Sequence, residues 1–139
     1  MNPGRIVSGS KPSGALHIGN YFGANKSWFE LQDHYDYFYF IANYHALTEE
    51  WDPAVLRTRT FQMALDLLAC GIDPERSLFF LQSDVPEHAE LTWIFNCLAS
   101  FGDFERLTQF KDRKERFEQT KSFLSVGLLI IPYFKAPMS

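Results

Sequence analysis

The sequence is poor in cysteine. Cys70 and Cys97 are its only two cysteines, and they lie far apart in apolar stretches. No CxxC spacing is present, which disfavours both a disulfide and a metal-binding pair. We therefore expect two reduced cysteines in the core of an intracellular protein, and no protein-bound metal.

An excess of basic charge and a long apolar run are also missing. The 139 residues carry a formal net charge of −4 at pH 7, which argues against a protein built for nonspecific nucleic-acid binding. No apolar run reaches the roughly 18–20 residues of a membrane helix, and the first residues lack the apolar core of a signal peptide. These absences predict a cytoplasmic protein with no membrane partner.

Apolar and aromatic residues, in contrast, are plentiful. They make up 46% (hydrophobic) and 17% (aromatic) of the chain, enough for the core of one domain. Asp52 and Pro53 are typical of a helix start and Gly71 of a helix end. Residues 37–42 are nearly all apolar, as in a strand covered on both faces. The expected strands are residues 5–9, 37–42 and 77–82, and the expected helices are residues 18–33, 53–70 and 86–99.

Strands that alternate with helices imply a parallel sheet with helical crossovers. The fold class we expect is therefore α/β, the first half of a doubly wound parallel sheet, because three strands supply only half of such a sheet. Residues 101–121 mix basic and acidic side chains and are nearly neutral. We expect that segment to be a solvated helix or loop.

The segment between the first strand and the first helix, SGSKPSGALHIGN, combines glycines with a proline, a histidine and an asparagine. The loop after the first strand is the commonest phosphate site in such sheets, although its glycine spacing fits neither GxGxxG nor a P-loop. His17 and Asn20 are three residues apart at the helix start. We expect them to face one ligand together and to donate hydrogen bonds to phosphate oxygens. The alternative is that His17 only caps the helix and Asn20 is an ordinary surface residue.

The longer stretch SGSKPSGALHIGNYFGA resembles the first signature of class I aminoacyl-tRNA synthetases, in the HIGN form of tryptophanyl-tRNA synthetases. Three further segments resemble the same family: IANYHALT, CGIDPERSLFFLQSDVPEHAELTWIFNCL and GDFERLTQFKDR. Together the matches cover nearly all of residues 5–131 in register. The resemblance implies a Rossmann-like class I catalytic domain, of which this chain is an N-terminal fragment.

The resemblance also implies a reaction and a set of site residues. The reaction is activation of tryptophan by ATP with Mg²⁺, followed by transfer to tRNA(Trp), with no covalent enzyme intermediate. His17 and Asn20 would be the catalytic pair that stabilises charge on the phosphates. The residues implied to bind ATP are Lys11, Pro12, Ser13, Gly19, Asn20, Lys111 and Arg113. Those implied to line the tryptophan pocket are Val7, Gly9, Ala42 and His45.

Some of these assignments have alternatives. Lys11 stands where the family often has glutamine, and it would serve a phosphate as a point charge. The alternative for His45 is a loop histidine with its hydrogen bonds already satisfied. For Lys111 and Arg113 the alternative is a solvated charged face.

The chain departs from the family near its end. The family places an aspartate there as the acceptor for the indole N–H, whereas this sequence has Met138, and a thioether is a poor substitute. A second half of the sheet, a KMSKS-like loop and a helical anticodon-binding domain are also not found. We therefore expect residues 1–139 to be a partial nucleotide-binding domain that is inactive alone. The family forms homodimers. For a partial domain, the resemblance does not determine the oligomeric state.

Other functions compete with this interpretation. The first is a noncatalytic module that associates with a synthetase or with a separately encoded second half. A different nucleotidyltransferase with an HxGN loop fits less well, because the resemblance extends far beyond the loop. A tyrosine-specific synthetase also fits less well, since GNYFGA and IANYHALT resemble the tryptophan branch.

Overall fold

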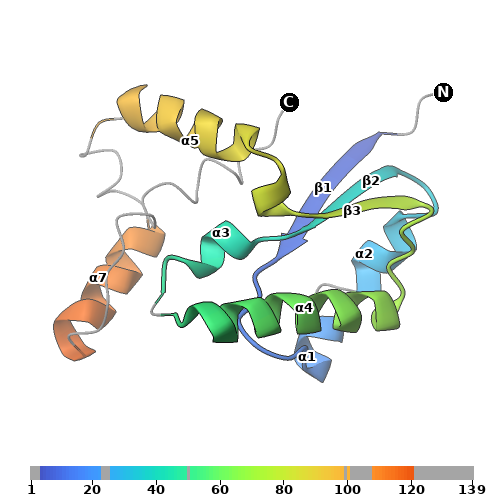
Figure 1. Cartoon of the computed structure of the whole chain (residues 1–139), viewed down its shortest axis with the longest axis horizontal. Coiled ribbons are helices and arrows are strands. Elements are labelled where there is room, and N and C mark those ends of the chain that lie inside the picture. The colour runs from blue at the N-terminus through green and yellow to red at the C-terminus, as the bar shows by residue number, and fades with distance from the viewer. Residues whose placement is uncertain (1–3, 23–25, 50, 99, 101–107, 121–139) are drawn as a thin grey trace. The chain divides into compact units, whose positions relative to one another are not determined.

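Three parallel strands form a single sheet (Figure 1). The computed structural model describes residues 4–22, 26–49, 51–98, 100 and 108–120. The sheet has the order β1-β2-β3, and both neighbouring pairs are parallel. This arrangement confirms the expected α/β class and the expected parallel sheet. The strands are β1 (Arg5–Ser10), β2 (Asp36–Ile41) and β3 (Ser77–Leu81).

The chain divides into two compact units. The first unit holds the sheet, and it comprises the described residues up to Ala46 together with Asp52–Asp84. Its helices are α1 (Ile18–Asn20), α2 (Lys26–Leu31), α3 (Asn43–Ala46), α4 (Pro53–Cys70) and the 3₁₀ turn η2 (Gln82–Asp84). The second unit holds α5 (Glu87–Leu98) and α7 (Thr108–Thr120). No helix within the described ranges is long and apolar enough to cross a membrane.

The ends of α4 are set by local chemistry, as the sequence predicts. Asp52 is the N-cap, and its Oδ1 accepts hydrogen bonds from the backbone N–H groups of Ala54 (2.8 Å) and Val55 (3.1 Å). Gly71 ends the helix in the left-handed region at φ 119°, which a glycine adopts without steric cost. The predicted helix of residues 53–70 is confirmed at both ends.

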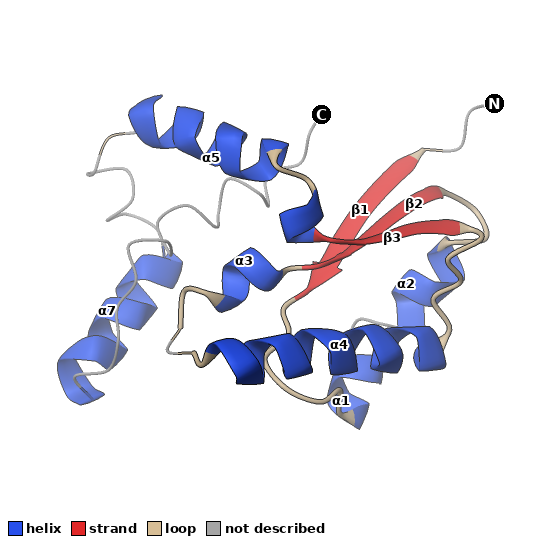
Figure 2. Cartoon of the chain, viewed as in Figure 1, coloured by secondary structure: helices blue, strands red, loops and turns tan. Residues whose placement is uncertain are grey.

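The core lies on one face of the sheet, against α2 and α4 (Figure 2). Its buried side chains are Tyr37, Tyr39 and Ile41 from β2, Met63 and Leu67 from α4, and Ile72. Side chains alternate between the two faces along each strand, so the intervening side chains point to the other face of the sheet. On that face Val7 and Leu78 are each 58% exposed, and they lie in register with Phe38 between them.

Within the first unit, helices cover only one face of the sheet, so the expectation that residues 37–42 are covered on both faces is confirmed for that face alone. We refer to the second face, with Val7, Phe38, Phe40, Leu78 and Phe80, as the open face. Its apolar character explains why the sequence alone suggested a strand buried on both sides.

The helix predicted over residues 18–33 is helical at both described parts: α1 continues in π-helical form at residues 21–22, and α2 ends at Leu31. Residues 23–25 lie outside the described ranges, so the continuity of this helix stays a prediction. The expectation about the cysteines needs correction. The cysteines are free, but they are not core residues, since Cys70 is partly buried and Cys97 is exposed. Cys97 lies on α5, and no residue of that helix is buried.

Candidate functional site

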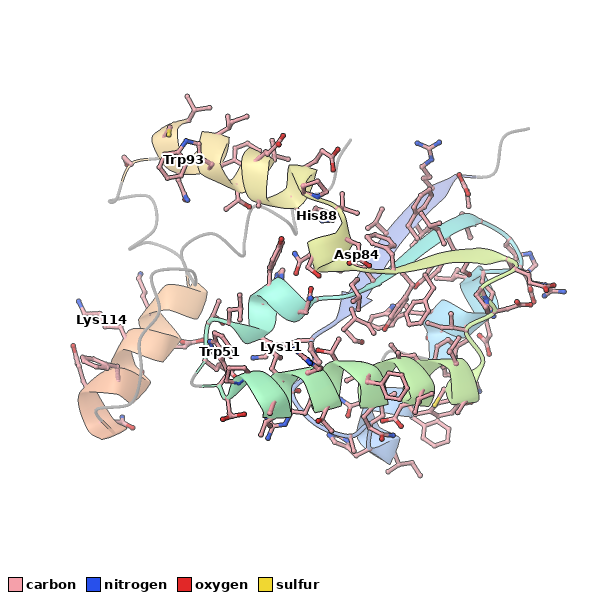
Figure 3. All side chains as sticks on the ribbon, viewed as in Figure 1. Lys11, Trp51, Asp84, His88, Trp93 and Lys114 are labelled. Atoms are coloured by element: carbon pink, nitrogen blue, oxygen red, sulfur yellow. The ribbon has the colours of Figure 1, made fainter. Side chains whose placement is uncertain are left out.

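The candidate site lies in the first unit, where the carboxyl ends of the three strands meet. Lys11 follows β1, Ala42 follows β2 and Gln82 follows β3. The backbone N–H of Ala42 donates to the carbonyl of Ser10 at 2.8 Å, so the parallel pairing continues to the start of the loop. Figure 3 shows Lys11 and Asp84 at this end of the sheet. The topology therefore brings together segments that are far apart in the sequence.

The loop after β1 is anchored at its beginning by buried contacts. Ser10 Oγ and the Tyr39 hydroxyl oxygen are 2.6 Å apart, and Tyr39 is fully buried. Burial raises the pKa of Tyr39 well above its ordinary value, and the hydrogen bond with Ser10 only partly offsets that shift. The phenol therefore stays neutral and holds the end of β1. Pro12 is also buried, and Ser13 N–H donates to the carbonyl of Lys11 at 2.8 Å in a tight turn.

His17 and Asn20 form a reciprocal cap at the start of α1. The Nδ1 atom of His17 accepts from the backbone N–H of Gly19 (3.1 Å) and of Asn20 (3.3 Å). In return, Asn20 Oδ1 accepts from the backbone N–H of His17 at 3.2 Å. The structure thus brings the two predicted catalytic residues together, and it also contains the helix cap that was the alternative interpretation.

The cap determines which atoms of the two side chains can act on a ligand. It occupies acceptor atoms only: Nδ1 of His17 and Oδ1 of Asn20. Because Nδ1 accepts, the proton of a neutral His17 ring must lie on Nε2. The donors of the pair are then Nε2–H of His17 and the Nδ2 amide of Asn20. Capping and donation to an anion are therefore compatible in one geometry.

Gly19 serves this cap in a way that the sequence did not reveal. A Cβ atom at this position would lie 3.0 Å from Cε1 and 3.1 Å from Nδ1 of His17. A side chain would crowd the imidazole and push it away from its backbone donors. The resemblance implies that Gly19 binds ATP, and the structure adds a reason of its own for glycine at this position, which is room for the His17 ring.

The residues predicted to line the amino-acid pocket lie in two different environments, the open face of the sheet and the carboxyl end of β2. Val7 and Gly9 lie on the open face of β1, and a Cβ on Gly9 would meet the Phe40 ring at 2.8 Å. Ala42 is buried at the end of β2. His45, on α3, is partly buried. Phe40 thus occupies the space above Gly9, which sequence reasoning missed because strand register was unknown.

Three polar residues at this edge of the sheet were also missed. Asn43 Nδ2 donates to Ser83 Oγ at 2.8 Å, and Ser83 N–H donates back to Asn43 Oδ1 at 3.1 Å. His45 Nδ1 lies 3.0 Å from Oε1 of Gln82, whose side chain is 1% exposed. Because an amide oxygen only accepts, His45 carries its proton on Nδ1. The available signal was position: polar residues that directly follow an apolar strand.

The remaining predicted residues lie outside the first unit. Lys111 is an exposed residue of α7 in the second unit, and Arg113 is on the same helix. Their roles stay predictions. Met138 lies outside the described residues. Within the described part of the chain, no group of three or more His, Cys, Asp or Glu side chains is placed to hold a metal ion.

Comparison with known proteins gives a consistent result. The family described as tRNA synthetases class I (W and Y) matches residues 1–136. A curated relative, tryptophan–tRNA ligase of Corynebacterium glutamicum, is 49% identical over 133 residues, which cover 95% of this chain and 38% of the relative. The crystal structure of tryptophanyl-tRNA synthetase from Campylobacter jejuni, complexed with ADP and tryptophan, is 42% identical with a TM-score of 0.85. That match covers 95% of this chain and 40% of the solved chain.

A tyrosine enzyme is more distant. Tyrosyl-tRNA synthetase from Archaeoglobus fulgidus is 21% identical with a TM-score of 0.65, which shows a shared fold only. The match covers 98% of this chain and 42% of that one. This chain therefore spans about two fifths of the length of the proteins that it matches.

Proposed function

The chain belongs to the family of class I tRNA synthetases for tryptophan and tyrosine, and from this membership we propose that it supplies the nucleotide-facing half of a tryptophan–tRNA ligase site. Tryptophan is favoured over tyrosine because the identity is 49% to the tryptophan relative but 21% to the solved tyrosyl enzyme. The solved tryptophanyl enzyme with ADP and tryptophan supports both ligands.

In the proposed reaction, a carboxylate oxygen of tryptophan attacks the α-phosphate of ATP. The bond from the α-phosphorus to the bridging oxygen breaks, so pyrophosphate leaves and tryptophanyl-adenylate forms. The ribose hydroxyl of the terminal tRNA adenosine then attacks the carbonyl carbon and releases AMP. Such chemistry needs positioning and charge stabilisation, not a covalent enzyme intermediate.

The loop after β1 would hold the nucleotide. His17 Nε2–H and the Asn20 amide donate to phosphate oxygens, and Lys11 contributes a positive charge. Gly19 keeps His17 in its cap, while Pro12 and Ser13 shape the turn. As the resemblance implies, Mg²⁺ would enter the site bound to ATP. The amino acid would lie at the carboxyl end of β2, near Ala42 and His45, with Val7 and Gly9 on the β1 side.

The observation that carries this proposal is the reciprocal cap, because it uses only the acceptor atoms of His17 and Asn20 and leaves their donor groups outside the cap. The test of this proposal is a calorimetric titration of the purified chain with Mg·ATP. Asparagine is itself a good N-cap residue, so His17→Asn keeps a cap but removes the Nε2–H donor. We expect roughly tenfold weaker ATP binding in that variant, as for the loss of one hydrogen bond to a charged group. Equal affinity in the two proteins would contradict the assignment.

We propose in addition that the chain alone does not activate tryptophan at a useful rate. It spans only 38% of the C. glutamicum ligase, so tRNA binding and the rest of the reaction depend on residues beyond these 139. The assay is tryptophan-dependent exchange of labelled pyrophosphate into ATP. Exchange near the rate of a full-length relative would refute this point.

We propose as a second candidate function a noncatalytic module in the cytoplasm that associates with a synthetase or with a separately encoded second half. Purification of the chain from its own cells at native expression level distinguishes the noncatalytic module from a synthetase fragment. A stoichiometric synthetase partner supports the module, whereas recovery of the chain without one supports a fragment. Sedimentation of the same purified material tests whether the chain forms the homodimer that the resemblance implies.

A further inference from the structure

A carboxylate on α4 holds the residue that precedes His17. The backbone N–H of Leu16 donates to Asp66 Oδ2 at 3.1 Å, although the two residues are 50 positions apart. The second oxygen, Oδ1, accepts from Gln62 Nε2 at 2.7 Å, one turn earlier on the same helix. Both carboxylate oxygens are thus engaged, Oδ2 by the loop and Oδ1 by Gln62.

This contact adjoins the cap at the start of α1. Leu16 is directly before His17, whose Nδ1 and backbone N–H form the cap with Asn20. The Leu16 side chain also packs against the hydrophobic core. Side-chain packing and the bond to Asp66 therefore fix this point of the loop from two directions. Upstream, Gly14 has no heavy atom within 4 Å of where its Cβ would be, so the middle of the loop has little support of its own.

We propose that Asp66 is a positioning residue for the nucleotide loop: by holding Leu16, it sets the position of the His17–Asn20 cap and so of the donors that face phosphate. This proposal rests on the function proposed above. It adds a residue outside the signature segment, supplied by the C-terminal third of α4. A carboxylate suits the role because it offers two acceptors, one for the loop and one for Gln62.

The test compares Asp66→Ala and Asp66→Asn in the complete 139-residue chain. Alanine removes both acceptors and favours the helix, so α4 itself should persist. Asparagine keeps one oxygen for Leu16, and its amide can donate to Gln62 Oε1 after that side chain rotates. Gln62→Ala is the matched control, since it removes a neighbour of the carboxylate but leaves the acceptor for Leu16.

Two measurements in the free protein come first: hydrogen exchange of the Leu16 amide, and the amide chemical shifts of Gly19 and Asn20. In Asp66→Ala we expect roughly tenfold faster exchange at Leu16, altered shifts at Gly19 and Asn20, and unchanged exchange within α4. Asp66→Asn should restore both signals toward the original values. The control Gln62→Ala should leave the Gly19 and Asn20 shifts in place. Unchanged Leu16 exchange or unchanged cap shifts in Asp66→Ala would overturn the proposal.

Titration with Mg·ATP then separates this inference from the proposed function. We expect weaker binding in Asp66→Ala, and recovery in Asp66→Asn. If the loop signals change but ATP affinity does not, Asp66 has only a structural role and the proposal fails. If the unmodified chain binds no ATP, the proposed function fails, while the cap shifts still decide whether Asp66 positions His17.

Discussion

Replacement of Gly9 by alanine tests the packing of the open face where it meets the candidate pocket. The new methyl group would lie 2.8–2.9 Å from three ring atoms of Phe40, which is closer than carbon atoms pack. The ring has limited room to move, because it also lies 5.7 Å from the ring of Phe80, centroid to centroid. The overpacking should cost about 1–3 kcal/mol.

Part of that cost is offset. Alanine restricts the unfolded chain more than glycine does, which stabilises by about 0.4–1 kcal/mol. Subtracting the gain from the overpacking cost leaves a net loss in the free energy of unfolding of about 0–2.6 kcal/mol, with a midpoint of about 1.3 kcal/mol. Gly14→Ala is the matched control, since no heavy atom lies within 4 Å of its Cβ position and its φ is not in the left-handed region. Gly14→Ala should therefore raise the free energy of unfolding by about 0.4–1 kcal/mol, without a cost from overpacking.

The assay is urea denaturation monitored by circular dichroism. Phe40→Leu supplies the second substitution of a double-mutant cycle. Leucine removes the ring atoms that the methyl group would meet. Gly9→Ala should therefore cost less in the Phe40→Leu background than in the original chain. Additive losses would refute the proposed contact between Gly9 and Phe40.

Three further changes test other parts of the structure. Asp52→Ala removes the N-cap of α4 and should lower the free energy of unfolding by about 1 kcal/mol; Asp52→Asn should recover most of that in the same denaturation assay. Gly71→Ala forces a side chain into a left-handed conformation at φ 119° and should lower the free energy of unfolding by about 1–2 kcal/mol; a free energy of unfolding as high as that of Gly14→Ala would contradict this. Burial raises the pKa values of Tyr37 and Tyr39 above the ordinary value of 10.0, so the folded state retains protons that the unfolded state releases. The resulting stability is present below pH 10 and declines as the pH rises beyond it. Spectrophotometric titration should show two late-ionising phenols in the folded chain, and ionisation of all tyrosines together near pH 10 would contradict the burial of Tyr39.

Much of the fold could be predicted because its signals are local. Asp52 and Gly71 mark the ends of α4 through hydrogen bonds and dihedral angles that involve only neighbouring residues. The three strands were recognisable from short apolar runs, and their alternation with helices implied parallel pairing. The helix over residues 18–33 was recognisable from its apolar period, and the described residues 18–22 and 26–31 are helical.

The candidate site could be predicted only in part. His17 and Asn20 are three residues apart, so their proximity is a local property, and the HIGN segment itself revealed the family. Gln82 and Phe40 were missed, because each acts on a partner in another segment: Gln82 on His45, and Phe40 on Gly9. No local pattern reports such a pair.

The sequence by itself therefore determined the family, the order of strands and helices, and the local cap between His17 and Asn20 in the loop after β1. These depend on residue type and on spacing within a few positions, where the backbone allows few geometries. Only the tertiary structure decided which face of the sheet is covered, that the Phe40 ring lies over Gly9, and that Asp66 reaches Leu16 from 50 positions away. Such contacts depend on the register and packing of whole elements, because their energy is realised only when many distant groups are buried together.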